Sequence, residues 1–320
     1  MTTTTPPSPA PNDELVRVNA PQSFWRGFWP AVREIVAHRE LLANLVHKEL
    51  KLKYKDSALG FLWSLARPLF LLMIYYVIFG IFLGAGIPDF AIYLFAGLLA
   101  FDLFSTIVGG GTTAIVGNAD LIKKVYFPRE ILILSVVGAA LVNFVLQLVV
   151  MVGALVVFSH PFIGTNLLYF PVGLVALLIF STAVGLLLSV ANVRLRDVQH
   201  LIELVLLFWF WTTPIVYQVS QATTSLGPHH LARVYLANPL VNIVMAFQRA
   251  FYQQGYVPGG AVSKPGIAGP ISQGGQLQPV LSNNGTLGLR LVAVIAFSML
   301  LLWLAQRVFA RAQGSFAQEL

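Results

Sequence analysis

The chain has 320 residues, of which 57% are hydrophobic and only 10% are charged, and its mean hydropathy is +0.76. A soluble globular protein carries roughly 25% charged residues, so this composition indicates an integral membrane protein. The net charge of +7 does not indicate nucleic-acid binding, because the basic residues lie beside apolar runs rather than on a polar soluble face. There is no cysteine, which excludes disulfides, thiolate metal sites and cysteine nucleophiles.

Residues 1–30 precede any membrane segment. Residues 1–12 are rich in Thr and Pro, and they lack the basic start and short apolar core of a signal peptide. We therefore expect a disordered N-terminal tail, and we expect the first spanning helix to act as its own insertion signal.

Residues 31–60 form a basic segment that leads directly into the first apolar run. Apolar residues and charges alternate here at helical spacing, which is typical of an amphipathic helix lying on the cytoplasmic face of a membrane. Charged side chains enter hydrocarbon only at high cost, so the segment should stay at the surface. The lysines assigned to this interface helix are Lys48, Lys51, Lys53 and Lys55.

Six apolar stretches are long enough to cross the hydrocarbon core as helices, which requires about 20 residues each. The predicted fold is therefore an all-α integral membrane protein, with a transmembrane domain over residues 61–306 and a cytoplasmic tail over residues 307–320. The six predicted spans are residues 61–83, 90–111, 131–158, 167–190, 201–219 and 286–306.

Lys and Arg are distributed unevenly around these spans. They gather before span one, between spans two and three, between spans four and five, and after span six, whereas the short loops 84–89 and 159–166 contain none. By the positive-inside rule, both termini are expected in the cytoplasm.

Two connecting loops are predicted to contain helices. The loop before span three holds apolar residues that a solvated turn would use poorly, so we expect a short helix, ended by Pro128, that presents them and neighbouring charges to a cytoplasmic protein. A surface-bound linker helix is the alternative. The outer loop after span five is mildly apolar around Asn238-Pro239-Leu240, which favours re-entrant or surface helices, and its Gly- and Pro-rich second half is expected to be flexible. The apolar residues of the first loop are Leu121, Ile122, Val125 and Phe127.

No enzyme motif is present. The chain lacks a G-x-x-x-x-G-K-[ST] P-loop, and it lacks H-E-x-x-H and G-x-S-x-G. Gly109-Gly110-Gly111 has no following lysine and is interpreted as a site of close helix packing or a helix end. The acidic residues Asp89, Asp102 and Glu203 are not spaced to hold a divalent metal. The chain is therefore expected to be no enzyme and to bind no metal.

Two acidic residues have structural interpretations beside a functional one. Asp102, within span two, is the best candidate for a coupling relay of a secondary transporter, but a role as partner of Arg67 or as a polar group at a helix bend is favoured. Glu203 is expected to form an interfacial ion pair with Arg194 or Arg196.

Aromatic residues gather within the spans. Trp ordinarily prefers membrane interfaces, yet Trp209 and Trp211 fall near the middle of span five. Because aromatic rings stack on the C–H faces of sugars, a sugar-lined path is one interpretation, and ordinary packing or lipid contact is the other. The residues assigned to a substrate path are Arg67, Tyr75, Phe79, Phe104, Trp209 and Trp211.

Taken together, these motifs resemble the polysaccharide-exporting branch of the ABC-2 type permeases, which includes O-antigen and teichoic-acid exporters. The resemblance covers about residues 39–255 and resumes at span six. It is carried by residues 51–68, 118–130 and 192–198, by Thr213-Pro214-Ile215-x-Tyr217 and by Asn238-Pro239-Leu240.

The resemblance implies the rest of a transporter in a bacterial plasma membrane. Two permease chains would form the channel for a lipid-linked polysaccharide, and two copies of a separate ATPase, which bind the ATP and Mg, would dock below it. This chain would bind no cofactor. The residues implied for the ATPase-coupling helix are Asp120, Leu121, Lys123, Lys124, Phe127, Pro128 and Arg129, and those implied for an outer gate are Asn238 and Pro239.

The Gly- and Pro-rich residues 255–278 depart from the family pattern by their length. With the Thr- and Pro-rich tail, they resemble an actinobacterial exporter of mycobacterial-type galactan. Two alternatives stay open: an ABC-2 exporter of a drug or small lipid, and a stand-alone membrane glycosyltransferase or flippase.

Overall fold

The structure is a computed structural model that describes residues 33, 36–54, 62–83, 89–125, 127–157, 164–226, 231–252, 272–273, 276–277, 284–314 and 316–320. These residues are almost entirely helical, and the strands among them are one antiparallel pair, β1 (Ser272–Gln273) and β2 (Gln276–Leu277). The predicted all-α class is therefore confirmed.

Within the described residues, five helices are long and apolar enough to cross a membrane. The first is α3 (Leu62–Tyr75), which continues as a π-helical segment through Phe82. A 3₁₀ turn, η3 (Thr165–Leu168), leads into the fourth. The others are α4 (Phe90–Thr113), α6 (Glu130–Val157), α7 (Tyr169–Arg194) and α12 (Asn284–Ala312).

The segment predicted as span five is shorter than expected. Its helix, α8 (Val198–Thr212), has 15 residues, so at 1.5 Å per residue it is about 22 Å long and does not cover a hydrocarbon core of about 30 Å. The predicted continuation of this helix to residue 219 is wrong. Pro214 disfavours helical geometry at the preceding residue, and Thr213 is accordingly extended.

The centre of the bundle is formed by α4 and α7. Of the most apolar window of α4, 72% is buried, against 6% of the window in α3, so α4 is a core helix and α3 faces outward. Small residues bring the central helices together: a Cβ at Gly111 of α4 would lie 3.1 Å from the Cα of Gly185 of α7. The interpretation of the glycine run as a close packing site is therefore confirmed at Gly111.

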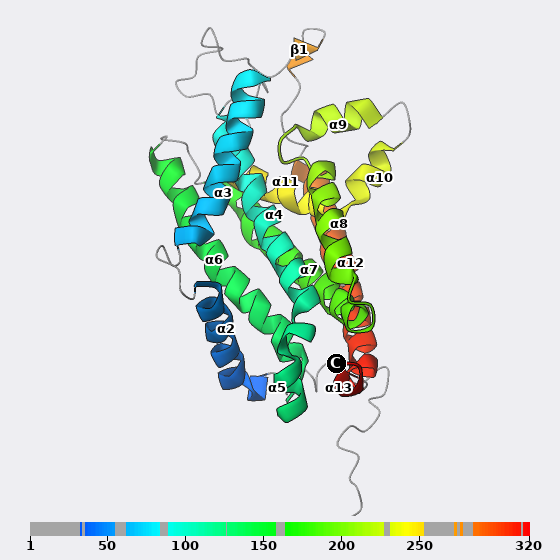
Figure 1. Cartoon of the computed structure of the whole chain (residues 1–320). Coiled ribbons are helices and arrows are strands. Elements are labelled where there is room, and N and C mark those ends of the chain that lie inside the picture. The colour runs from blue at the N-terminus through cyan, green and yellow to red at the C-terminus, as the bar shows by residue number, and fades with distance from the viewer. Residues whose placement is uncertain are drawn as a thin grey trace, which may run out of the picture.

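The two ends of the bundle carry different short helices (Figure 1). At one end lie α2 (Arg39–Tyr54), α5 (Ala119–Lys124), which follows the 3₁₀ turn η2 (Val116–Asn118), and α13 (Phe316–Glu319). At the opposite end lie α9 (Val219–Leu226), α10 (Ala232–Ala237) and the β1 strand. This arrangement places the loop before α6 and the C-terminus at the same end.

Two further helices pack closely against the bundle. The N-terminal α2 lies on α6, where a Cβ at Gly138 would lie only 2.6 Å from Cγ2 of Val46. The helix α11 (Pro239–Tyr252) is buried from Leu240 onward, because it packs among α4, α7 and α12. It therefore belongs to the core and not to a surface loop.

Candidate functional site

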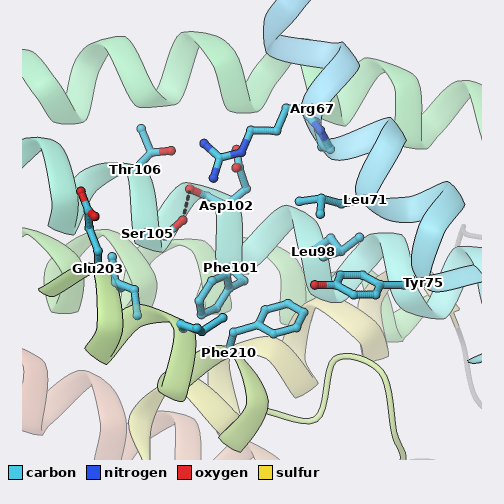
Figure 2. Close-up of a pocket in the computed structure, with 13 residues that line it drawn as sticks. Arg67, Leu71, Tyr75, Leu98, Phe101, Asp102, Ser105, Thr106, Glu203 and Phe210 are labelled. Carbon is cyan, nitrogen blue, oxygen red and sulfur yellow. Dashed lines mark hydrogen bonds between the residues drawn. The ribbon is translucent and has the colours of Figure 1, made fainter. Parts of the chain in front are cut away.

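A cavity of about 400 Å³ lies between α3, α4 and α8 (Figure 2). Its lining changes from charged at one end to aromatic at the other, as the sticks in Figure 2 show. Such a cavity can hold a polar group and an attached ring at the same time. The charged end is formed by Arg67, Asp102 and Glu203, with Ser105 and Thr106 beside them, and the aromatic end by Tyr75, Phe101 and Phe210.

A second cavity, of about 640 Å³, lies between α2, α4 and α6. Arg67 lines both cavities, so the two meet at its side chain. Lys48 and Lys53 of α2 line the second cavity, and Nζ of Lys48 donates a hydrogen bond of 2.6 Å to Oδ1 of Asn118. The second cavity is therefore rich in cations.

The charges around Arg67 influence one another. Burial lowers the pKa of the Lys53 ammonium, the nearby carboxylate of Asp102 raises it, and the guanidinium of Arg67 lowers it further. Asp102 is held by a hydrogen bond of 2.9 Å that Nε2 of Gln147 donates to its Oδ2. Asp102 thus has a structural partner on α6, which the sequence did not predict, and its side chain also faces Arg67 in the cavity (Figure 2).

The structure divides the five aromatic residues assigned to a substrate path into two groups. Tyr75, Phe79 and Trp211 lie together, with ring centroids 6.2 to 6.4 Å apart. Phe104 is fully buried and packs at 5.1 Å against Trp209, so both belong to the contact between α4 and α8. Only the first group lies beside the aromatic cavity, where Tyr75 stacks on Phe210 at 5.5 Å.

Three cavity residues were missed from the assigned path. Glu203 was expected to form an ion pair with Arg194 or Arg196, but in the structure it lines the cavity. The other two, Phe101 and Phe210, form its aromatic end. Helical spacing could have grouped the two residues on α8, since residues 203 and 210 are two turns apart and share one face of that helix.

Trp209 and Asn238 join α8 to the outer helices. Nε1 of Trp209 donates to Oδ1 of Asn238 at 3.3 Å, and the same oxygen accepts from the backbone N–H of Leu240 at 3.0 Å. Asn238 thereby caps α11, and Pro239 occupies the first helical position, which needs no N–H donor. The predicted gate residues therefore lie at the start of a buried helix.

The backbone that follows α8 is bonded to side chains of α4 and α11. The hydroxyl of Tyr93 donates to the carbonyl oxygen of Tyr217 at 2.8 Å, and Nε2 of Gln248 donates to that of Pro214 at 2.7 Å. These bonds satisfy buried carbonyl groups where the helix has ended. They give the irregular residues after Thr212 a defined path.

The predicted coupling helix corresponds to α5, which ends at Lys124 rather than at Pro128. The prediction that the apolar residues of this loop face outward is wrong for two of them. Ile122 and Phe127 are only 6% and 5% exposed, because they pack into the chain's own core. Val125 is 51% exposed. The side chains that face outward with it are Asp120, Lys123 and Lys124, whereas Leu121 and Arg129 are half-buried and Pro128 is buried.

The C-terminal helix α13 packs against α5 and α7. Phe316 is 1% exposed, its ring lies 5.4 Å from that of Phe309, and the guanidinium of Arg129 lies over it at 5.8 Å. The sequence did not predict this contact. Of the interface lysines, Lys51 is exposed and lines neither cavity, and Lys55 lies outside the described residues.

The groups of acidic residues and histidines in the described part of the chain include none that could hold a metal ion. The described residues therefore offer no metal site that would support the alternative of a metal-dependent membrane enzyme.

Comparisons with known proteins agree with this geometry. A family model described as "ABC-2 type transporter" matches residues 40–252. The chain is similar to the O-antigen export system permease protein RfbA of Myxococcus xanthus, with 33% identity over 290 residues that cover 90% of this chain and 98% of that relative.

Two further relatives are more distant. An RfbA of the same description from Klebsiella pneumoniae is 29% identical over 212 residues, which cover 66% of this chain and 80% of the relative. The polysialic acid transport protein KpsM of Escherichia coli is 26% identical over 217 residues, which cover 67% of this chain and 81% of the relative.

Proposed function

Because the chain belongs to the ABC-2 type transporter family, we propose that it is the permease subunit of an ATP-driven exporter of lipid-linked polysaccharide. The observation that carries this proposal is its similarity, over 98% of the relative's length, to a protein named an O-antigen export permease. The cavity between α3, α4 and α8 supports it, because aromatic rings beside carboxylates suit a sugar. An O-antigen, a teichoic acid or a mycobacterial-type galactan is the proposed glycan class.

We propose six membrane passages, with both termini in the cytoplasm and the chain in a bacterial plasma membrane. The passage beyond the five long helices would be span five, formed by α8 together with residues 213–218, whose backbone is irregular but bonded to α4. Irregular backbone is tolerated at membrane depth where it is buried in protein. The excess of Lys and Arg at the end that carries α2, α5 and α13 supports this orientation.

The working transporter would contain two copies of this chain. Both α3 and α8 border the aromatic cavity, and α8 exposes large apolar side chains, including Phe208 at 71%. A second copy docked along α8 would close the open cavity into a channel. Its outer opening would be controlled at Asn238 and Pro239, where α11 begins.

In this proposal, two copies of a separate cytoplasmic subunit bind ATP and Mg and hydrolyse the ATP. The exposed charges of α5 would contact that ATPase, and α2 would lie beside it. Phe127 and Pro128 would hold the loop in place from inside, because both are buried. Arg129 would connect the loop to α13 through its contact with Phe316.

Deleting the gene in its own host tests the proposed function. We expect surface polysaccharide to disappear and lipid-linked glycan to accumulate on the cytoplasmic side, and we expect the wild-type chain to restore export. Normal surface polysaccharide in the deletion strain would overturn the proposal. An exporter of a drug or small lipid would instead leave the glycan unchanged and alter resistance or lipid composition.

A further inference from the structure

The cavity between α2, α4 and α6 has an excess of positive charge. Three cations, Lys48, Lys53 and Arg67, line it against the single carboxylate of Glu49. The three side chains are exposed at the mouth of the cavity, and like charges that share a site repel one another. Partial desolvation and the guanidinium of Arg67 lower the pKa of the Lys53 ammonium, and the carboxylate of Asp102 raises it. An anion bound among the three side chains would relieve the repulsion.

The remaining lining suits an oxygen-rich anion. Asn143, which is 5% exposed, presents a polar side chain from α6, and Ser105, Thr106 and Thr113 line the α4 wall. The amide oxygen of Asn118 holds one proton of the Lys48 ammonium, which leaves its other two free to donate. Arg67 offers a planar fork of donors, which matches the geometry of a phosphate group.

We propose that this cavity binds the phosphate or diphosphate group of a lipid-linked substrate, with Arg67 as the central contact. The inference rests on the proposed function and deepens it, since it assigns the headgroup of that substrate to named residues. Three kinds of surface meet at Arg67, and each suits one part of such a molecule.

The first surface is the cationic cavity, which receives the phosphate. The second is the adjoining cavity of about 400 Å³, where Tyr75, Phe101 and Phe210 offer rings to the first sugar. Asp102 of α4 and Glu203 of α8 line this second surface and would accept hydrogen bonds from the hydroxyl groups of that sugar, and Asp102 also lies close enough to Lys53 to raise its pKa.

The third surface is the outer face of α3, which suits the hydrocarbon tail. Phe70 and Met73 are 56% and 55% exposed, and they follow Arg67 by three and six residues along the same helix. A charged headgroup at Arg67 with its tail along this face keeps the charge out of hydrocarbon and leaves the tail within it. The substrate would thus enter beside α3 with its orientation already fixed.

Binding measurements on the full-length chain test this assignment. The chain is placed in nanodiscs of phosphatidylcholine, and farnesyl diphosphate is titrated as the probe. We expect Arg67→Gln and Lys53→Gln each to weaken binding about tenfold or more, because each loses a charge-assisted hydrogen bond. Arg67→Lys should retain an intermediate affinity, since it keeps the charge but loses the fork.

Arg39→Gln is the matched control, because Arg39 is an exposed cation on α2 that lines neither cavity. Equal binding by wild type and Arg67→Gln, at unchanged thermal stability, would overturn the anion site. An equal loss in Arg39→Gln would also overturn it, because the effect would then be general surface charge.

Two further arms identify the source of the phosphate. Inorganic pyrophosphate should bind much more weakly than farnesyl diphosphate, and equal binding would overturn the assignment to a lipid-linked ligand. Nanodiscs of phosphatidylglycerol should leave probe binding in place, whereas full competition would assign the site to bulk lipid. If export of polysaccharide does not depend on the chain, the proposed function is overturned. If export does depend on the chain but Arg67→Gln binds farnesyl diphosphate as the wild type does, only the proposed phosphate site is overturned.

Discussion

Gly111 lies where the backbones of α4 and α7 approach each other closely. A Cβ there would be 3.1 Å from the Cα of Gly185, and a backbone atom cannot move aside as a flexible side chain can. Gly109, two residues earlier, has no atom within 4 Å of its Cβ position. The two glycines therefore form a matched pair.

We predict that Gly111→Leu destabilises the protein by about 1–3 kcal/mol or more, because it forces the two central helices apart. Gly109→Leu should be close to neutral, since leucine is a good helix former and has space there. Thermal unfolding in detergent, followed by size-exclusion chromatography, compares the two. Equal melting temperatures would show that the approach at Gly111 is not limiting.

Asn238 combines two structural roles, as the cap of α11 and as the acceptor for Trp209. We predict that Asn238→Ala lowers the stability by about 1–2 kcal/mol, because a cap bond is lost and the indole N–H loses its partner. Asn238→Asp keeps the acceptor oxygen and should lose less. Thermal unfolding of both variants is the measurement, and a loss in Asp as large as in Ala would argue against the capping role.

At the scale of elements, the two lysines of α5 test the coupling role. Lys123 and Lys124 are exposed, so they do not support the fold from inside. We predict that reversing both charges to Glu weakens co-purification of the ATPase at least severalfold and leaves membrane insertion unchanged. Unchanged co-purification would remove α5 from the docking surface.

The C-terminal helix provides a second test of the same element. Phe316 packs against Phe309 and lies under Arg129, so it supports the loop from below without facing outward. We predict that Phe316→Ala reduces ATPase co-purification, because a cavity under the loop lets α5 shift. Glu319→Gln, which changes an exposed residue of the same helix, should have no effect. An equal loss in Glu319→Gln would point to charge and not to packing.

At the scale of the whole molecule, α8 is expected to face a second copy. The chain has no cysteine, so a single introduced cysteine reports without background. We predict that Phe208→Cys, at a position that is 71% exposed on α8, forms a disulfide-linked dimer in membranes. Val292→Cys, 63% exposed on α12, should stay monomeric on non-reducing gels. Dimers from Val292→Cys alone would place the interface elsewhere.

Sequence and structure differ most where one helix meets another. The sequence offered Arg67 as one partner of Asp102, and the two side chains face each other in the cavity, but the hydrogen bond to that carboxylate comes from Gln147, 45 residues later on α6. It also assigned Phe104 to a path, although its neighbour Phe101 is the one that lines the cavity. Both differences concern the rotation of a helix about its own axis.

The sequence by itself determined the membrane class, the approximate positions of the spans and the uneven distribution of charge. These properties are local, since each segment must bond its own backbone and match the thickness of the bilayer. Tertiary structure decided which side chains meet. A helix that is apolar over most of its surface, as α4 is, has only a weak periodic pattern to set its rotation, so close contacts such as that between Gly111 and Gly185 help to set it. Those contacts bring Lys53, Arg67 and Asp102 together from three different helices.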